Sequence, residues 1–159
     1  MLVPQLELFP LADLVEPAVE RASARPSHRS IIVDFPDDVP PVRVDGALLD
    51  RIVSNLLDNA IAHAPAPAPI RIRARPSADE MVALTVEDGG PGVPDDDLGV
   101  VFDRFRRLDR TDVGGGRRGF GLGLAVVRGL TEAMGGTVRA GRSELGGLAV
   151  TVTLQADAG

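Results

Sequence analysis

The chain lacks cysteine and lysine altogether and contains only two histidines, His28 and His63. Without cysteine there is no disulfide framework and no thiolate metal site, and two histidines are too few for most zinc centres. The absence of lysine excludes every site that depends on a lysine ammonium: the Walker A loop, the strand lysine of protein kinases and the Schiff base of pyridoxal enzymes.

Long apolar runs and an excess of positive charge are also missing. No segment approaches the roughly 18 uninterrupted apolar residues of a membrane-spanning helix, and residues 1–10 carry no basic stretch followed by an apolar one. The formal net charge of −6 and the pI near 4.9 argue against a surface built for nucleic acid. We therefore expect no nucleic-acid partner, no membrane insertion by this chain, and a cytoplasmic location in which recruitment to a membrane-bound partner stays open.

What the chain does contain is enough for one domain, because 44% of its 159 residues are hydrophobic. Residues 1–10 are interpreted as a lead-in segment and residues 11–156 as the domain. Periodicity and turn residues then predict helices over 11–24, from about 46 to the prolines that begin at 65, over 98–108 and over 122–134, and strands over 30–35, 42–44, 70–74, 81–87, 137–140 and 149–154.

Two details refine this outline. Asp45 is placed to cap the second helix, and residues 111–121 are so rich in glycine and arginine that they predict a mobile loop. Helices and strands mix, and the last two strands are expected to be antiparallel. The predicted fold is therefore a two-layer α/β sandwich with a mixed sheet.

The second helix carries a polar interruption in its apolar stripe. Asn55 and Asn59 lie one turn apart on the same face, and His63 follows one turn later. Asparagine is a mediocre helix former, so two of them at this spacing indicate amides directed at a ligand. A solvated polar face is the alternative interpretation, and the pattern of this helix alone does not decide between the two.

Two glycine-rich segments add candidates. Asp88 ends a predicted strand and is followed by residues 89–92, Gly-Gly-Pro-Gly, whose backbone can pass close to a flat ligand while the carboxylate accepts a hydrogen bond. An ordinary acidic turn is the alternative. Residues 119–124 open a predicted helix and offer backbone N–H groups and the helix dipole to phosphate. They do not match the dinucleotide fingerprint, which requires a βαβ unit.

Taken together and in this order, these segments resemble the ATP-binding domain of two-component sensor histidine kinases, within the superfamily that includes DNA gyrase B, Hsp90 and MutL. The resemblance covers nearly the whole chain. It implies a Bergerat-type ATP-binding fold, in which a mixed sheet is covered on one face by three main helices. The four matching motifs are an N-box at 55–60, a first glycine box at 88–92, an F-box at 101–105 and a second glycine box at 119–124.

The resemblance also implies roles for individual residues. Asn59 would ligate Mg²⁺ through its amide oxygen, a donor that this hard cation prefers. Asp88 would accept a hydrogen bond from the adenine amino group and so select ATP over GTP, and Asn55 and Arg107 would be catalytic. The implied ATP site comprises Asn55, Asp58, Asn59, Ala62, His63, Asp88, Gly90, Gly92, Val93, Arg107, Arg118, Gly119, Phe120, Gly121, Leu122, Gly123 and Leu124.

The chain departs from the family pattern at two positions. Ala62 stands where family members usually carry lysine or arginine, so one phosphate contact is missing. Phe120 stands where a small residue is usual between the first two glycines of the second glycine box. Both departures indicate weakened nucleotide binding and keep a degenerate ATP-sensing module open as an alternative function.

The nucleophile separates the remaining function classes. Gyrase-like ATPases carry a water-activating glutamate at the position of Asn55, whose neutral amide is a poor base, so transfer to a histidine is favoured. A stand-alone serine kinase that antagonises sigma factors is the first alternative, ahead of the ATP-sensing module. Neither His28 nor His63 is followed by the acidic residue typical of the family's acceptor, and the ten residues before Leu11 are too few for a dimerising helical hairpin.

We therefore expect a protein histidine kinase that uses Mg-ATP and contains no phosphoacceptor domain. It would act in trans on the histidine-bearing dimerisation domain of a sensor kinase, in another polypeptide, and indirectly on a response regulator.

Overall fold

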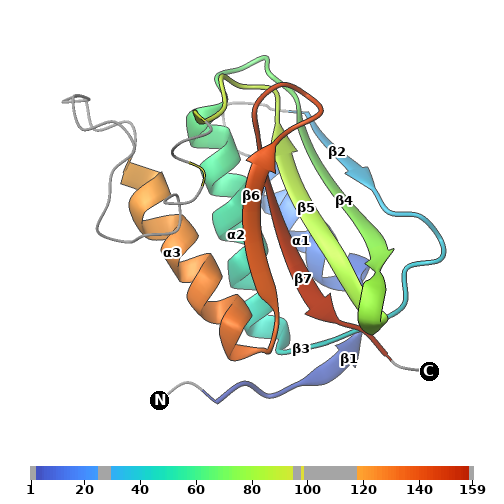
Figure 1. Cartoon of the computed structure of the whole chain (residues 1–159). Helices are drawn as coiled ribbons and strands as arrows, with labels where there is room; N and C mark the ends of the chain where they lie inside the picture. The colour runs from blue at the N-terminus through green and yellow to red at the C-terminus, as the bar shows by residue number, and fades with distance from the viewer. Residues whose placement is uncertain (1–2, 25–29, 95–97, 99–117, 158–159) are drawn as a thin grey trace.

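The computed structural model describes residues 3–24, 30–94, 98 and 118–157. These residues fold into two layers, a β-sheet and a layer of helices that covers one of its faces (Figure 1). The helices are α1 (Leu11–Ser23), α2 (Gly46–His63) and α3 (Arg118–Ala133), and the strands are β1 (Glu7–Phe9), β2 (Ile31–Asp34), β3 (Val42–Val44), β4 (Ile70–Ser77), β5 (Met81–Asp88), β6 (Thr137–Arg142) and β7 (Leu148–Gln155).

The main sheet has the strand order β2-β4-β5-β7-β6. Strand β2 pairs with β4 in parallel, and the other neighbouring pairs are antiparallel. A short second sheet joins β1 to β3. The predicted two-layer α/β sandwich with a mixed sheet is therefore confirmed.

The two faces of the main sheet differ in character because side chains alternate along each strand. On β5, Val82, Leu84 and Val86 are buried in the core under the helices. The same alternation places Thr85 and Glu87 on the outer face, together with polar residues of β4 and β7. The core is continuous between the sheet and the helices.

Helix α2 lies at the centre of the helical layer and contacts α1, α3 and β5. Its start is fixed as predicted, since the Asp45 carboxylate accepts hydrogen bonds from the backbone N–H groups of Ala47 at 3.1 Å and Leu48 at 3.2 Å. Its apolar stripe, which includes Leu49, Ile52 and Leu56, is buried. Among the described residues, no helix is long and apolar enough to cross a membrane.

Strands β1 and β4 differ from the sequence-based expectation. The sequence assigns no strand to residues 1–10, yet β1 forms there because β3 offers it a pairing edge. Strand β4 continues three residues beyond the predicted end, through Pro76. Because β2 pairs only with residues 70–73 of β4, Pro76 lies on an open edge where its missing N–H is tolerated.

Helix α3 begins at Arg118, so the prediction that residues 118–121 belong to a loop is wrong. The apolar periodicity starts only at Leu122, whereas the helical backbone starts one turn earlier, where N–H groups need no partner inside the helix. The rest of the predicted loop, residues 111–117, lies outside the described residues. So do the F-box and all of the predicted 98–108 helix except Leu98.

Candidate functional site

The C-terminal end of α2 and the loop that follows β5 are in contact, and together they carry several of the predicted site residues. Gly90 makes this approach possible, because a Cβ at this position would lie 2.8 Å from the Ala64 Cα and 3.1 Å from the His63 carbonyl oxygen. Only glycine avoids that overlap. The first glycine box is thus packed directly against the end of the helix that carries Asn55 and Asn59.

Asp88 is the last residue of β5 and is 5% exposed. Its Oδ1 atom accepts hydrogen bonds from the backbone N–H groups of Gly90 at 2.9 Å and Leu148 at 3.4 Å. Backbone donors to an ionised carboxylate are charge-assisted and fix its direction. The structure therefore presents Asp88 as an oriented acceptor, the property required for reading a ligand amino group.

Asn59 is 6% exposed, and its Oδ1 atom is buried without a hydrogen-bond partner among the described residues. Buried polar atoms in native proteins nearly always have a hydrogen-bond partner. We therefore expect this oxygen to bind a group that lies outside the described residues. An amide oxygen is a hard donor that suits Mg²⁺. The described part of the chain holds no group of three or more His, Cys, Asp or Glu side chains arranged for a metal ion.

The other α2 residues of the predicted site are distributed over more than one face. Asn55 is half-buried, His63 is 9% exposed and Ala62 is exposed. Asp58 is exposed and lines a small hollow between α1 and α2 together with Arg21. The structure thus places Asp58 on the α1 side of the helix, away from the loop that follows β5.

The remaining residues of the predicted site lie in the loop after β5, in helix α3 and outside the described residues. Gly92 has a positive φ of 76°, which favours glycine, and Val93 belongs to the core at 7% exposure. A Cβ at Gly123 would meet no atom of the described residues within 4 Å, and Leu124 is fully buried. Arg118, Gly119, Phe120, Gly121 and Leu122 begin α3, which packs against α2, and Arg107 lies outside the described residues.

An apolar hollow of about 530 Å³ adjoins the site. It is formed by the loop after α2 and the loop after β5, and it is lined by Pro65, Pro67, Ala68, Pro69, Gly89, Gly90 and Pro91. The sequence analysis interprets these prolines only as residues that end α2. Their alternation with alanine gives no signal for a hollow, which depends on the contact between Gly90 and α2.

The turn between β6 and β7 is a further part of the site that the sequence does not reveal. The Gly147 N–H donates to the Asp88 carbonyl oxygen at 3.0 Å, and a Cβ at Gly147 would overlap the Asp88 carboxylate. The glycine pair 146–147 lies in the turn between the last two strands, and only the fold shows that this turn lies against Asp88. A glycine was needed here because the turn covers the carboxylate closely.

Comparison with known proteins identifies the class. Residues 44–158 match the model of the histidine kinase-, DNA gyrase B- and HSP90-like ATPase family, so the chain belongs to this family. It is 36% identical over 135 residues to the sensor protein KdpD of Clostridium acetobutylicum, an alignment that covers 85% of this chain and 15% of KdpD.

Solved structures agree with this assignment. The mycobacterial sensor histidine kinase MprB has a TM-score of 0.76 and 27% identity, with 95% of this chain and all of that chain covered. Full-length ShkA, solved in complex with AMPPNP, has a TM-score of 0.78 and 28% identity, with 99% of this chain and 33% of that chain covered.

The resemblance to the ATP-binding catalytic domain of sensor histidine kinases is therefore confirmed. The chain spans between 15% and 34% of the length of the curated relatives that it matches.

Proposed function

We propose that this domain binds Mg-ATP and transfers its γ-phosphoryl group to a histidine on a separate dimerisation domain of a sensor kinase, which then serves a response regulator. One observation carries the proposal: the oriented acceptor of Asp88 and the Asn59 oxygen, which has no hydrogen-bond partner among the described residues, lie on two elements that Gly90 brings into contact. We propose a cytoplasmic location for the domain, because ATP and response regulators are found there. The ShkA structure with AMPPNP supports a nucleotide as the ligand.

Asp88 is the proposed reader of adenine. Its carboxylate would accept a hydrogen bond from the 6-amino group, whereas guanine presents a carbonyl oxygen there and would repel it. Hydrogen bonds to charged groups contribute about 1.5–3 kcal/mol, which corresponds to roughly tenfold to a hundredfold preference for ATP.

Asn59 is the proposed magnesium ligand, with phosphate oxygens and water completing the shell. A magnesium ion held there would supply positive charge that offsets the negative charge of the phosphates. The start of α3 would face the phosphates with backbone N–H groups, as expected for a glycine-rich helix N-terminus next to α2. Arg107 stays a proposed catalytic residue.

The acceptor histidine is proposed to lie outside the domain. In the transfer, an imidazole nitrogen of the acceptor forms a bond to the γ-phosphorus, the bond to the bridging oxygen breaks, and ADP leaves. Asn55 cannot remove a proton from water efficiently, so hydrolysis is disfavoured. His63 is unsuited as the acceptor because it is buried on the same helix as Asn59.

The test is phosphorylation of the purified chain with γ-labelled Mg-ATP, alone and with an added dimerisation domain from a sensor histidine kinase. We expect acid-labile label only on the added domain. Acid-labile label on this chain alone would falsify transfer in trans. Acid-stable label on a serine of an added partner would favour the serine-kinase alternative, and nucleotide binding without any transfer would favour the ATP-sensing module.

A further inference from the structure

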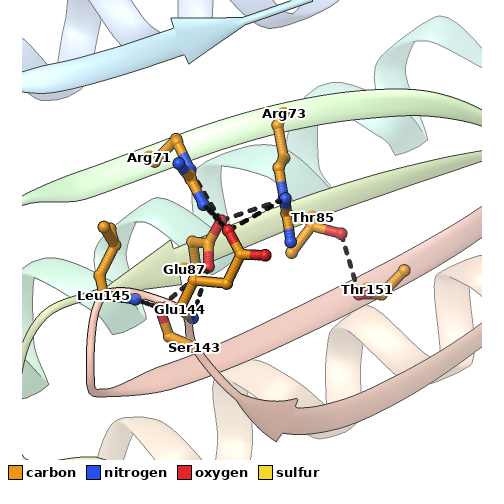
Figure 2. A network of polar contacts seen from close by, with 8 residues as sticks. All are labelled: Arg71, Arg73, Thr85, Glu87, Ser143, Glu144, Leu145 and Thr151. Carbon is orange, nitrogen blue, oxygen red and sulfur yellow. Dashed lines mark hydrogen bonds and ion pairs between the residues drawn. The ribbon is translucent and has the colours of Figure 1, made fainter.

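Glu87 directly precedes Asp88 and points to the opposite face of the sheet, because neighbouring strand residues alternate. Although it lies on the outer face, its side chain is fully buried. Figure 2 shows it surrounded by Arg71 and Arg73 of β4 and by residues 143–145 of the turn between β6 and β7. A buried carboxylate is retained only where paired charges and hydrogen bonds compensate for its lost hydration.

The two oxygens of Glu87 face two different elements. Oε2 accepts from Arg71, with distances of 2.8 Å to Nε and 2.6 Å to Nη2, and forms an ion pair with Arg73 Nε at 3.1 Å. Oε1 accepts from the Ser143 hydroxyl at 2.9 Å and from the Glu144 N–H at 3.3 Å. Glu87 therefore joins β4 to the start of the turn.

The arginines strengthen this junction from the side of β4. The hydrogen bond with Glu87 raises the pKa of Arg71 above its usual value. Arg71 also donates to Glu144 at 2.8 Å, and this bond lowers the pKa of Glu144. Both groups thus stay charged around the buried carboxylate.

The turn transmits this anchoring to Asp88. The Ser143 hydroxyl accepts from the Leu145 N–H at 2.8 Å, and the Ser143 N–H donates to the Gly147 carbonyl at 2.8 Å, which closes the turn. At its far end the Gly147 N–H donates to the Asp88 carbonyl, and the Leu148 N–H donates to Asp88 Oδ1. The turn is bound at its start by Glu87 and at its end by Asp88.

We propose that Glu87 is a positioning residue for adenine recognition: through Ser143 and the 143–147 turn, it holds the Leu148 N–H, one of the two backbone donors that orient the Asp88 carboxylate. This inference rests on the proposed role of Asp88. Loss of the Glu87–Ser143 bond would release the turn, move the Leu148 N–H away from Oδ1 and leave Asp88 less well directed. The effect would appear only with ligands that carry the 6-amino group.

The experiment compares calorimetric affinities for Mg-ATP and for Mg-purine riboside triphosphate, which lacks the 6-amino group. In Glu87→Gln and Ser143→Ala, the ratio of the two affinities should fall several-fold while the affinity for the analogue stays unchanged. Ser143→Thr, which keeps a hydroxyl, should restore the ratio. Thr85→Val is the matched control, since Thr85 lies on the same face of β5 and its hydroxyl forms a hydrogen bond across the sheet, with Thr151 at 2.9 Å.

Asp88→Asn separates this inference from the proposed function. If the wild-type protein does not distinguish the two nucleotides, or if Asp88→Asn leaves the ratio unchanged, the adenine assignment fails and the positioning role fails with it. Two results would overturn only the positioning role, provided that Asp88→Asn lowers the ratio. In the first, Glu87→Gln and Ser143→Ala leave the ratio unchanged. In the second, they lower the affinities for both nucleotides equally. Should Glu87→Gln prevent folding, Ser143→Ala decides, because it leaves both arginine ion pairs in place.

Discussion

At the scale of single residues, Asn59 and Asp88 represent opposite states of a buried polar group. Asp88 Oδ1 already has backbone donors, whereas Asn59 Oδ1 has no partner in the described part of the chain. A satisfied acceptor can be removed only at a cost to the native fold, but an unsatisfied one contributes little to it. The two residues should therefore respond differently to mutation.

Asn59→Ala should abolish the magnesium dependence of ATP binding and leave the fold intact. The mutation removes an oxygen that stabilises nothing within the described residues. Calorimetric titration with magnesium and with EDTA, together with thermal melting, measures both effects. Ser54→Ala, on the same helix but hydrogen-bonded to Arg21 towards α1, should bind ATP like the wild type. An unfolded Asn59→Ala protein would show that Asn59 is structural.

Asp45 has a pH-dependent role at the start of α2. Hydrogen bonds from the backbone N–H groups of Gln5, then Leu48, lower its pKa. A carboxylate whose pKa is lower in the folded state stabilises that state fully above the unfolded value of about 3.9, and this contribution is lost as the pH falls through the folded value.

Asp45→Ala should therefore cost about 0.5–2 kcal/mol at pH 7. The cost should shrink as the pH falls from the unfolded value of about 3.9 through the lower folded pKa of Asp45. Asp45→Asn, which keeps a capping oxygen without a charge, should lose less at neutral pH. Urea unfolding of the three proteins at pH 7 and near pH 3 gives the comparison. A cost for Asp45→Ala that does not change with pH would contradict the role of the charge.

At the scale of elements, the predictable parts are those with a strong periodic pattern. Helix α2 and strands β5 and β7 follow their apolar residues closely. The three-residue β1 gives no such pattern and depends on pairing with β3. The sequence pattern does not predict the first turn of α3, because this turn contains no apolar stripe and only the backbone conformation defines it.

The candidate site also has parts that the sequence predicts and parts that it does not. Asn55, Asn59 and Asp88 are recognisable because their residue types and spacing are unusual in a helix or at a strand end. The link from Glu87 through Ser143 to Asp88 joins residues up to 60 positions apart, and only the strand order brings them together. No local pattern in the sequence encodes it.

The contact between the loop after β5 and α2 can be tested with one glycine. In Gly90→Ala, the added Cβ would lie 2.8 Å from the Ala64 Cα and 2.9 Å from its Cβ, so the loop must move away from α2. We expect a loss of about 1–3 kcal/mol in the free energy of unfolding and weaker ATP binding.

Gly141→Ala is the matched control for this change. Its added Cβ would meet no atom of the described residues within 4 Å, and its backbone does not need a positive φ. Its stability should stay within about 1 kcal/mol of the wild type, with a gain as the favoured direction. Urea unfolding and ATP titration of both variants test the prediction. Equal behaviour of the two would show that the loop does not depend on contact with α2.

At the scale of the whole molecule, the site couples the two layers of the fold. Asp88 belongs to the sheet and Asn59 to the helical layer. A ligand that contacts both would add an interaction between the layers that the native state has and the unfolded chain lacks. Ligand binding should therefore appear as stability of the entire domain.

Mg-ATP should raise the midpoint of thermal unfolding in proportion to its affinity. At a hundred times its dissociation constant, a ligand specific for the native state adds about 2.7 kcal/mol. For a domain of this size, that corresponds to a shift of roughly 5–10 °C. Mg-GTP at the same concentration should give a smaller shift, because the Asp88 carboxylate opposes the guanine carbonyl, and Asp88→Asn should make the two shifts more alike. Differential scanning calorimetry over a nucleotide series measures the dependence directly, and equal shifts for both nucleotides in the wild-type protein would contradict adenine recognition by Asp88.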